Sequence, residues 1–381
     1  MLKFVAQKKL ICSSNIIKNE LHLKKNELQI KINTKMIKNG RNTILDFLKE
    51  NPSSSSKKIY ESITLNQSYA TIKRLLRQLV NDNLIVVDYI GKASKYSCSP
   101  QFQLFQNIDI NQYFEKEIDE RIIQSNFNLD LMNRTLPEIN IFSISETNKL
   151  NDWQAQFQVN ISQLSDKEYE KEMERLAIDL SWKSSQIEGN TYSLLETEKL
   201  LKDKITATGK TKDDAVMLLN HKATIDFIVA NKDYLSPLSV SRIEDIHSLL
   251  MKELGIERNI RIRKVGITGT NYSPLDNEFQ IIDALQDLCN LINKKLSVFE
   301  KSFLVLVLLS YIQPFVDGNK RTARIVSNAV LIENGYCPIS FRTVDSIDYK
   351  KAMLVFYEQN NFQPMKSIFM NQFEFAVKTY F

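Results

Sequence analysis

The pattern of apolar residues from position 303 onward indicates the segment around which we expect the rest of the chain to be arranged. Residues Phe303–Ile312 are almost all apolar, which predicts a buried helix, and Pro314 ends that helix. Residues 317–319, Asp-Gly-Asn, predict a tight turn, and a second segment of helical period begins at Lys320. The pattern therefore predicts a helix, a tight turn and a second helix.

The turn between these two helices is a candidate binding site for phosphate. The first backbone N–H groups of a helix have no partner within it, so beside a Gly-Asn turn they form a concave cluster of donors. Asp317, Lys320, Arg321 and Arg324 surround this cluster. A carboxylate for a divalent cation beside two guanidinium groups is what a nucleoside polyphosphate needs.

Most of the remaining pattern is helical, so we expect a mainly α fold. Helical periodicity predicts further helices over residues 42–49, 57–63, 67–81, 118–131, 169–188, 211–229, 239–254, 279–296, 349–358 and 367–379. Alternating apolar and polar positions predict a β-hairpin from residues 84–90 and 93–99, and a short strand over 28–34.

These elements divide the chain into four parts. We predict a basic N-terminal segment over 1–39, a small domain over 40–100, a connector over 101–150 and a large helical domain over 151–381. Three helices followed by a hairpin, as in residues 40–100, resemble a winged helix-turn-helix. The resemblance implies that the exposed side of its third helix meets DNA, through the basic side chains Lys73, Arg74 and Arg77. The other interpretation, which stays open, is the solvated face of a protein-interaction module.

Composition and charge narrow the classes of protein. The chain has 381 residues and a net charge of +5, which permits nucleic-acid contact in one region without indicating it for the whole. The four cysteines have no paired spacing, which argues against zinc sites and a disulfide framework and for a reducing compartment. We see no signal peptide and no apolar run of membrane length, so we expect a cytoplasmic protein that does not enter a membrane.

The run from Gln313 to Arg324 resembles the signature of the Fic (Fido) family. It reads Gln-Pro-Phe-Val-Asp-Gly-Asn-Lys-Arg-Thr-Ala-Arg, against His-Pro-Phe-x-Asp/Glu-Gly-Asn-Gly/Lys-Arg-x-x-Arg in the family, and differs at the first fixed position only. The resemblance implies a helical domain that transfers AMP from ATP to a hydroxyl side chain of a target protein. It also implies Mg²⁺ at Asp317 and a nucleotide held by Gly318, Asn319, Lys320, Arg321, Arg324 and Asn328.

The exception at Gln313 bears directly on catalysis. The family's histidine is a general base, whereas an amide can orient a hydroxyl but cannot take its proton at neutral pH. General-base catalysis contributes roughly 10²–10⁴-fold to a rate. We therefore expect a chain that binds nucleotide and transfers AMP slowly or not at all, with Arg321 and Arg324 completing the catalytic set.

A second motif lies upstream, at the end of the predicted helix near residues 169–190. Ser184-Ser-Gln-Ile-Glu188-Gly189-Asn190 resembles the inhibitory motif of the same family, Ser/Thr-x-x-x-Glu-Gly/Asn. The resemblance implies that Glu188 pairs with Arg324, so that this guanidinium cannot hold the γ-phosphate of ATP. The arrangement implies inhibition within one molecule.

Residues 261–279 contain short β-prone pieces around Gly266 and Gly269. They predict a β-hairpin that resembles the family's flap, an edge on which the backbone of a target lies as an added strand. The flap residues beside the nucleotide would be Thr268, Gly269, Thr270 and Tyr272. A connecting hairpin without a partner is the alternative.

Two functions from different classes remain open. In the first, the chain is an enzyme restrained by Glu188, either a protein adenylyltransferase or an enzyme that reverses this modification. In the second, it is a degenerate Fic domain that binds a nucleotide or a partner while the winged helix engages DNA. Gln313 favours the second, and the complete set Asp317, Asn319, Arg321 and Arg324 favours the first. A glutamine introduced in place of a natural histidine would reconcile the two. The target protein and a homo-oligomeric state are not determined by the sequence.

Overall fold

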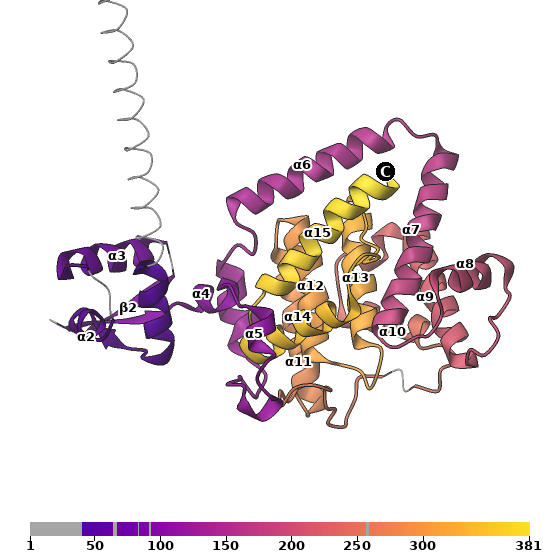
Figure 1. Cartoon of the computed structure of the whole chain (residues 1–381). Helices are drawn as coiled ribbons and strands as arrows, with labels where there is room; N and C mark the ends of the chain where they lie inside the picture. Colours follow the sequence, from indigo (N-terminus) through magenta and orange to yellow (C-terminus); the bar gives the residue numbers. More distant parts are fainter. Residues whose placement is uncertain (1–39, 64–66, 83, 91–92, 257–258) are drawn as a thin grey trace, which may run out of the picture. The chain divides into compact units, whose positions relative to one another are not determined.

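The computed structural model describes residues 40–63, 67–82, 84–90, 93–256 and 259–381, and the chain divides into two compact units, residues 1–103 and 104–381 (Figure 1). The predicted strand over 28–34 lies outside the described residues. Within the described residues, no helix is long and apolar enough to cross a membrane.

The first unit combines helices with a small antiparallel sheet. Residues 40–50 are helical, and the elements that follow are β1 (Ser54–Ser55), α2 (Ser56–Ser62), α3 (Tyr69–Asn81), β2 (Ile85–Ile90), β3 (Ala93–Cys98) and α4 (Pro100–Phe105), which reaches the second unit. The sheet has the order β1-β3-β2, with Val87 opposite Tyr96. Helix α3 begins where the Ser68 side chain accepts a hydrogen bond from the Thr71 N–H, and it buries four aliphatic residues, Ile72, Leu75, Leu76 and Leu79.

The second unit is helical. Its α-helices are α5 (Ile110–Tyr113), α6 (Ile144–Ile161), α7 (Asp166–Ile187), α8 (Leu194–Asp203), α9 (Lys212–Ala230), α10 (Val240–Leu250), α11 (Glu278–Lys294), α12 (Val298–Ile312), α13 (Asn319–Glu333), α14 (Ser346–Gln359) and α15 (Gln363–Tyr380). Short 3₁₀ turns η1 (Ile118–Glu120), η3 (Leu136–Glu138) and η4 (Lys232–Leu235) and a π turn η2 (Leu131–Thr135) connect them. The prediction of a mainly α fold is confirmed.

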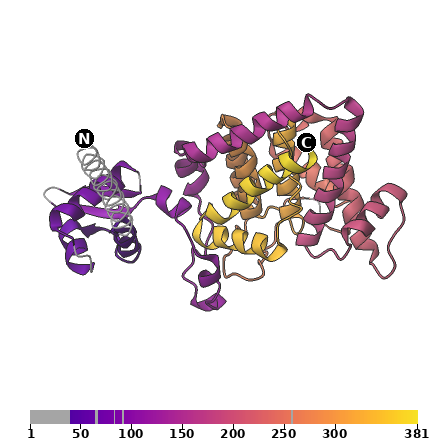
Figure 2. The ribbon, with the colours of Figure 1, turned by 45° about the horizontal axis from the view of Figure 1, so that its top comes forward.

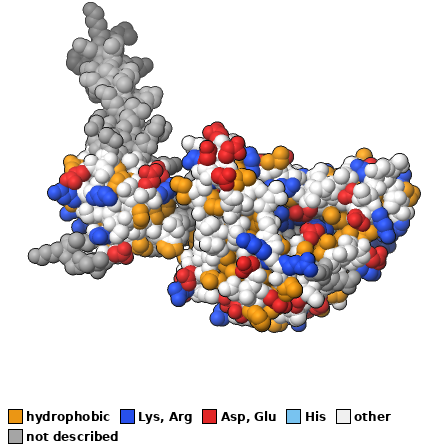
Figure 3. Space-filling model, turned by 90° about the horizontal axis from the view of Figure 1, so that it is seen from below, with side chains coloured by type: hydrophobic (Ala, Val, Ile, Leu, Met, Phe, Trp, Pro, Cys, Tyr) orange, Lys and Arg blue, Asp and Glu red, His pale blue; other side chains and the backbone are white. Residues whose placement is uncertain are grey.

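Helices α12 and α13 form the centre of this unit. Helix α12 is apolar around its whole circumference and buried along almost its entire length, as expected of a helix with neighbours on every side. Helices α11, α14 and α15 pack against α12, and α7, α9 and α10 pack against α13 (Figures 1 and 2). The surface is mixed in charge, with acidic and basic side chains interspersed over one face (Figure 3).

The structure corrects the prediction for residues 101–150 and for the region after α7. The helix expected over 118–131 is absent, since only the single 3₁₀ turn η1 forms there. Helices α6 and α8 were not predicted, although each begins with a capping box, Ser143 with Glu146 and Ser193 with Glu196. This reciprocal pairing of the N-cap and N3 side chains is visible in sequence as Ser-x-x-Glu.

The hairpin predicted over residues 261–279 is wrong. The described residues between α10 and α11 form an irregular loop, in which Ser273 makes one isolated parallel bridge with Asn126. Buried Arg261 holds this loop instead, because its guanidinium donates to the carbonyls of Gln313, Arg263 and Leu275. With its backbone tied to a side chain and to other parts of the fold, the loop has no cross-strand ladder.

Candidate functional site

The turn between α12 and α13 is shaped by two residues in the left-handed region. Gln313 ends α12 with φ 52°, and Gly318 precedes α13 with φ 82°. A Cβ at Gly318 would lie 2.7 Å from Met251 Cε, so this position needs glycine for its backbone angle and for its space. No side chain caps α13, and its first backbone N–H groups face the turn.

The ring of His247 and the amide of Asn319 support this turn. The imidazole stacks on Phe315 with ring centroids 3.6 Å apart, and its Nε2 donates to the Asp317 carbonyl at 2.9 Å. The Asn319 amide accepts from the Phe315 N–H at 2.8 Å and donates to the Phe315 carbonyl at 2.8 Å. Asn319, predicted to bind nucleotide, therefore keeps the loop in shape with its side chain.

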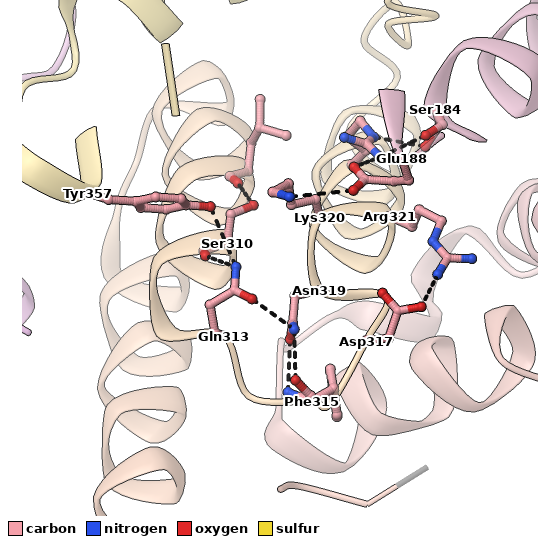
Figure 4. Close-up of polar contacts among 12 residues, drawn as sticks. Ser184, Glu188, Ser310, Gln313, Phe315, Asp317, Asn319, Lys320, Arg321 and Tyr357 are labelled. Atoms are coloured by element: carbon pink, nitrogen blue, oxygen red, sulfur yellow. Dashed lines mark hydrogen bonds and ion pairs between the residues drawn. The ribbon is translucent and has the colours of Figure 1, made fainter. Parts of the chain in front are cut away.

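The amide of Gln313 is engaged on both sides (Figure 4). Its Nε2 donates to the Ser310 carbonyl at 2.6 Å and lies 3.5 Å from the Tyr357 hydroxyl. Its Oε1 accepts from Asn319 Nδ2 at 3.0 Å. The side-chain oxygen of Gln313 is thus already hydrogen-bonded to the turn.

Arg324 and Glu188 form an ion pair in which the guanidinium is fully buried and the carboxylate is mostly buried. Arg324 NH2 lies 2.8 Å from Glu188 Oε1, and its Nε donates to the Ser184 hydroxyl at 2.8 Å. Glu188 occupies the C-cap of α7, followed by Gly189 with φ 103°, so the helix ends where the carboxylate reaches α13. The structure therefore brings together the predicted residues Ser184, Glu188 and Arg324.

The electrostatics of this pair favour an ionised carboxylate. Burial by itself would raise the pKa of Glu188, but the charges of Arg324 and Lys320 and the hydrogen bond from Arg324 outweigh it and lower that pKa to about 2. Lys320 Nζ lies 3.4 Å from Glu188 Oε2. Glu188 is therefore charged at every physiological pH.

Arg321 presents a different environment one turn earlier on α13. Its side chain is buried, yet only NH2 has an oxygen partner, the Asp317 carboxylate at 2.8 Å. Its Nε and NH1 are buried without a hydrogen-bond partner. Donors buried in this way carry a free-energy cost, because they have lost water without gaining another acceptor.

A cavity of about 390 Å³ opens beside the turn. Three groups of residues line it: Gln313, Val316, Asp317, Gly318, Asn319 and Lys320 from the turn and the start of α13, Ile187 and Glu188 from the end of α7, and Gly266, Ile267, Thr268, Lys350, Met353, Leu354 and Tyr357 opposite. The contribution of α14 was not predicted, although Lys350, Met353, Leu354 and Tyr357 have the i, i+3, i+4, i+7 spacing of one helical face.

Asn328 does not line this cavity, although we expected it near the nucleoside. Its Nδ2 donates to the carbonyls of Arg324 and Ile339, and its Oδ1 accepts from the Ile339 N–H at 2.6 Å. Asn328 therefore fastens the segment after α13 to that helix.

Of the four predicted flap residues, only Thr268 lines the cavity. Tyr272 is buried and stacks on Tyr311 and Tyr357, so it anchors the loop in the core. The Thr270 hydroxyl accepts from the Tyr272 N–H at 3.1 Å. Gly269 has φ 91°, and its carbonyl is already occupied.

A strap formed by residues 119–126 holds this loop and was missed by sequence reasoning. Arg121 NH2 donates to the Gly269 carbonyl at 2.7 Å, and its NH1 lies 3.3 Å from buried Glu358 of α14. The Ser273 N–H donates to the Ser125 carbonyl at 2.8 Å. No local pattern marks Arg121, because its partners lie more than a hundred residues away.

A cation site built by protein ligands alone is absent from the described residues, since they contain no group of three or more His, Cys, Asp or Glu side chains that could hold a metal ion. A single exposed carboxylate, Asp317, stands at the cavity. Mg²⁺ usually takes one or two protein carboxylates together with substrate phosphates. Asp317 fits that role with a phosphate present.

In the first unit, Lys73, Arg74 and Arg77 all lie exposed on α3, away from its buried face. Lys73 Nζ lies 4.7 Å from the centre of the Tyr69 ring. The structure thus gathers these three predicted residues on one exposed helical surface.

Comparison with known proteins supports the interpretation of the larger unit. Residues 237–331 match the Fic/DOC family. Protein adenylyltransferase fic-1 of Caenorhabditis elegans is 23% identical over 176 residues, covering 44% of this chain and 34% of that protein. Protein adenylyltransferase Fic of Nematostella vectensis is 30% identical over 178 residues, covering 44% of this chain and 40% of that protein. The chain thus spans only about a third to two fifths of these curated relatives.

Solved structures agree on the fold. Residues 134–508 of Fic-1 from C. elegans align with a TM-score of 0.55 at 19% identity, covering 62% of this chain and 72% of that one. A Fic family protein from Desulfovibrio desulfuricans aligns with a TM-score of 0.53 at 19% identity, covering 64% and 75%. The family match thus identifies a Fic/DOC family domain over residues 237–331, and the solved structures agree with its fold.

Proposed function

We propose that the Fic domain binds ATP in the cavity beside the α12–α13 turn and transfers AMP to a hydroxyl side chain of a target protein. The observation that carries this proposal is the cavity itself, lined by the start of α13 and by the charged side chains of Asp317 and Lys320. The adenylyltransferase names of the relatives support the reaction.

In this reaction the target's oxygen attacks the α-phosphorus of ATP, pyrophosphate leaves, and the hydroxyl proton passes to a base or to water. The N–H groups at the start of α13 and the guanidinium of Arg321 would hold the phosphates. Asp317 would hold Mg²⁺, which neutralises phosphate charge when it is bound. These residues supply position and charge, which dominate phosphoryl-transfer catalysis.

Glu188 restrains this activity, because its carboxylate uses the guanidinium NH2 that a γ-phosphate would need. Ser184 holds the same guanidinium from α7. The inhibitory contact belongs to one chain, so dilution would not relieve it.

Gln313 limits the rate separately from Glu188. An amide has no useful basicity, and its carbonyl oxygen already accepts from Asn319. This contact also favours a second function, a Fic domain that binds nucleotide without transferring it.

The experiment that tests the proposal uses radiolabelled ATP and Mg²⁺ with the parent chain, Glu188→Gly, Gln313→His and the double variant. Self-modification by the double variant with little by the others supports a restrained transferase. Nucleotide binding without transfer in the double variant supports the binding module. Calorimetry that shows no ATP binding, by Glu188→Gly as well as by the parent, would rule out both.

For the first unit we propose a winged helix that contacts DNA through Lys73, Arg74 and Arg77. Its order of helices and strands and the exposure of these cations on α3 support the proposal. Retention of duplex DNA by the full chain should fall steeply with salt, with a slope near −0.9 in log K against log salt for each neutralised phosphate. Substituting these three residues with glutamine should remove this salt dependence. If the triple variant retains DNA as well as the parent does, a protein-interaction module is favoured.

The cytoplasmic location of the protein stays a prediction.

A further inference from the structure

The carboxylate of Glu188 is held by two cations, one at each oxygen. Oε1 lies 2.8 Å from Arg324 NH2. Oε2 lies 3.4 Å from Lys320 Nζ, and Figure 4 shows Lys320 pointing toward Glu188. The motif that resembles an inhibitory motif accounts for the first contact. It does not account for the second.

The two cations differ in their freedom to move. The Arg324 side chain is fully buried, and Ser184 holds its Nε and NH2. The Lys320 side chain is 24% exposed, lines the cavity and has Glu188 as its only charged or hydrogen-bonding partner among the described residues. An ammonium on a flexible four-carbon chain can change partners without disturbing its helix.

Lys320 also stands at the start of α13, whose first residues line the cavity and whose first backbone N–H groups have no partner within the helix. A phosphate placed on those groups would bring negative charge close to the Lys320 ammonium, which then competes for the same cation as Glu188. The carboxylate and the phosphate cannot both keep a close contact with one ammonium at full strength.

We propose that Lys320 is a switching cation: it holds Glu188 in the empty site and moves to the phosphates when a nucleoside triphosphate binds. This inference rests on the proposed function, since it takes the cavity as the nucleotide site. Binding then has to break the contact of Glu188 with Lys320 as well as its pair with Arg324. The inhibitory motif would thus act on two phosphate-binding cations.

The proposal makes a prediction about coupling that a simple phosphate-binding lysine does not share. With Glu188 present, removing Lys320 loses a phosphate contact but also frees the site from one restraint, so the two effects offset each other. With Glu188→Gln, the restraint is already gone and only the loss remains. Lys320 therefore contributes more to ATP affinity when Glu188 is neutral.

The experiment measures Mg-ATP affinity by calorimetry for the parent, Lys320→Met, Glu188→Gln and the double variant. We expect Lys320→Met to weaken binding on the order of tenfold in the Glu188→Gln background, as for a lost charge-assisted contact, and by less than about threefold in the parent background. Lys320→Arg, which keeps a cation, should retain most of the affinity in both backgrounds.

Lys350 provides a matched control. It lines the same cavity but forms no ion pair within the described part of the chain. Lys350→Met should change ATP affinity by the same factor in both backgrounds.

Two outcomes separate the inference from the function on which it rests. Equal losses for Lys320→Met in both backgrounds, with ATP still bound, would overturn the switching role and leave the nucleotide site in place. No ATP binding in any variant would overturn the proposed function, and the inference with it.

Discussion

Arg321 and Arg324 lie one turn apart on α13, and both are buried, yet the carboxylates that pair with them differ in exposure. Arg324 is paired with Glu188 and anchored by Ser184. Arg321 keeps Nε and NH1 without a hydrogen-bond partner. Arg321 is also paired, with Asp317, and Arg324 NH1 is also buried without a hydrogen-bond partner, so the two arginines differ mainly in that Glu188 is only 19% exposed whereas Asp317 is 58% exposed.

Gln313 adds a chemical defect to this electrostatic one, and restoring the base should give the largest effect. In the Glu188→Gly background, Gln313→His should raise AMP transfer by roughly 10²–10⁴-fold, because a histidine can take the hydroxyl proton. Initial rates of self-modification at saturating ATP measure this. Rapid transfer by Glu188→Gly alone would show that the amide suffices.

Removing each arginine in turn should break the comparison directly. Arg324→Met should destabilise the protein by about 3 kcal/mol, the lower end of the cost of breaking a buried pair, because Glu188 is 19% exposed and keeps its contact with Lys320. Arg321→Met should cost much less, because the exposed Asp317 carboxylate is the only charged group that it leaves. Urea unfolding provides both values, and equal losses would contradict the asymmetry.

Lowering the pH should destabilise the protein by protonating Glu188, the partner of Arg324. The folded pKa of Glu188, about 2, is below its ordinary value of 4.5, so the unfolded chain takes up this proton first as the pH falls. The stability contributed by this group is fully present above about pH 4.5 and is lost as the pH falls toward 2. This group contributes roughly 3 kcal/mol to the free energy of unfolding when its stabilisation is fully present. Unfolding free energies between pH 6 and 3 should therefore fall less steeply for Glu188→Gln than for the parent. Parallel curves would show that the carboxylate is not held in this way.

The smallest effect is expected at Gly318, in the turn that precedes Arg321 on α13. Gly318→Ala combines a strained φ with a close contact to Met251, and it should cost about 1–3 kcal/mol. Gly209→Ala is the matched control, since its φ is also positive, 77°, but nothing lies within 4 Å of the added carbon. It should cost about 1 kcal/mol, from backbone strain alone. Thermal unfolding of both variants, with ATP affinity measured alongside, separates the space at Gly318 from its angle.

Sequence reasoning was strongest where one local pattern decides the structure. The apolar run before Pro314, the Asp-Gly-Asn turn and the following helical period led to α12, the turn and α13. Helices α3, α7 and α9 were also predicted, from the spacing of their apolar residues, although the prediction for α7 began at residue 169 and missed its cap at Ser165. The capping boxes of α6 and α8 were overlooked, although they were equally local.

Sequence reasoning was weakest for residues 261–279, where it predicted a hairpin that does not form. Glycine and β-branched residues favour strands and turns, but a hairpin also needs a second strand to pair with. Arg261 and the 119–126 strap take the backbone groups that such a ladder would use. The competing contacts come from a buried side chain and from residues about 150 positions away, which no local period reveals.

The sequence by itself determined the helical core, the order of the site residues on the α12–α13 turn and the chemical nature of Gln313, because these depend on residue type and short spacing. Only the tertiary structure decided what each group contacts. It placed Lys320 against the second oxygen of Glu188, turned the Gln313 amide toward Asn319 and Ser310, and withdrew Asn328 and Tyr272 from the cavity. The contact of Lys320 with Glu188 joins residues 132 positions apart, and even the short-range contacts of Gln313 depend on how the α12–α13 turn is held by the surrounding helices, which is a property of the whole fold.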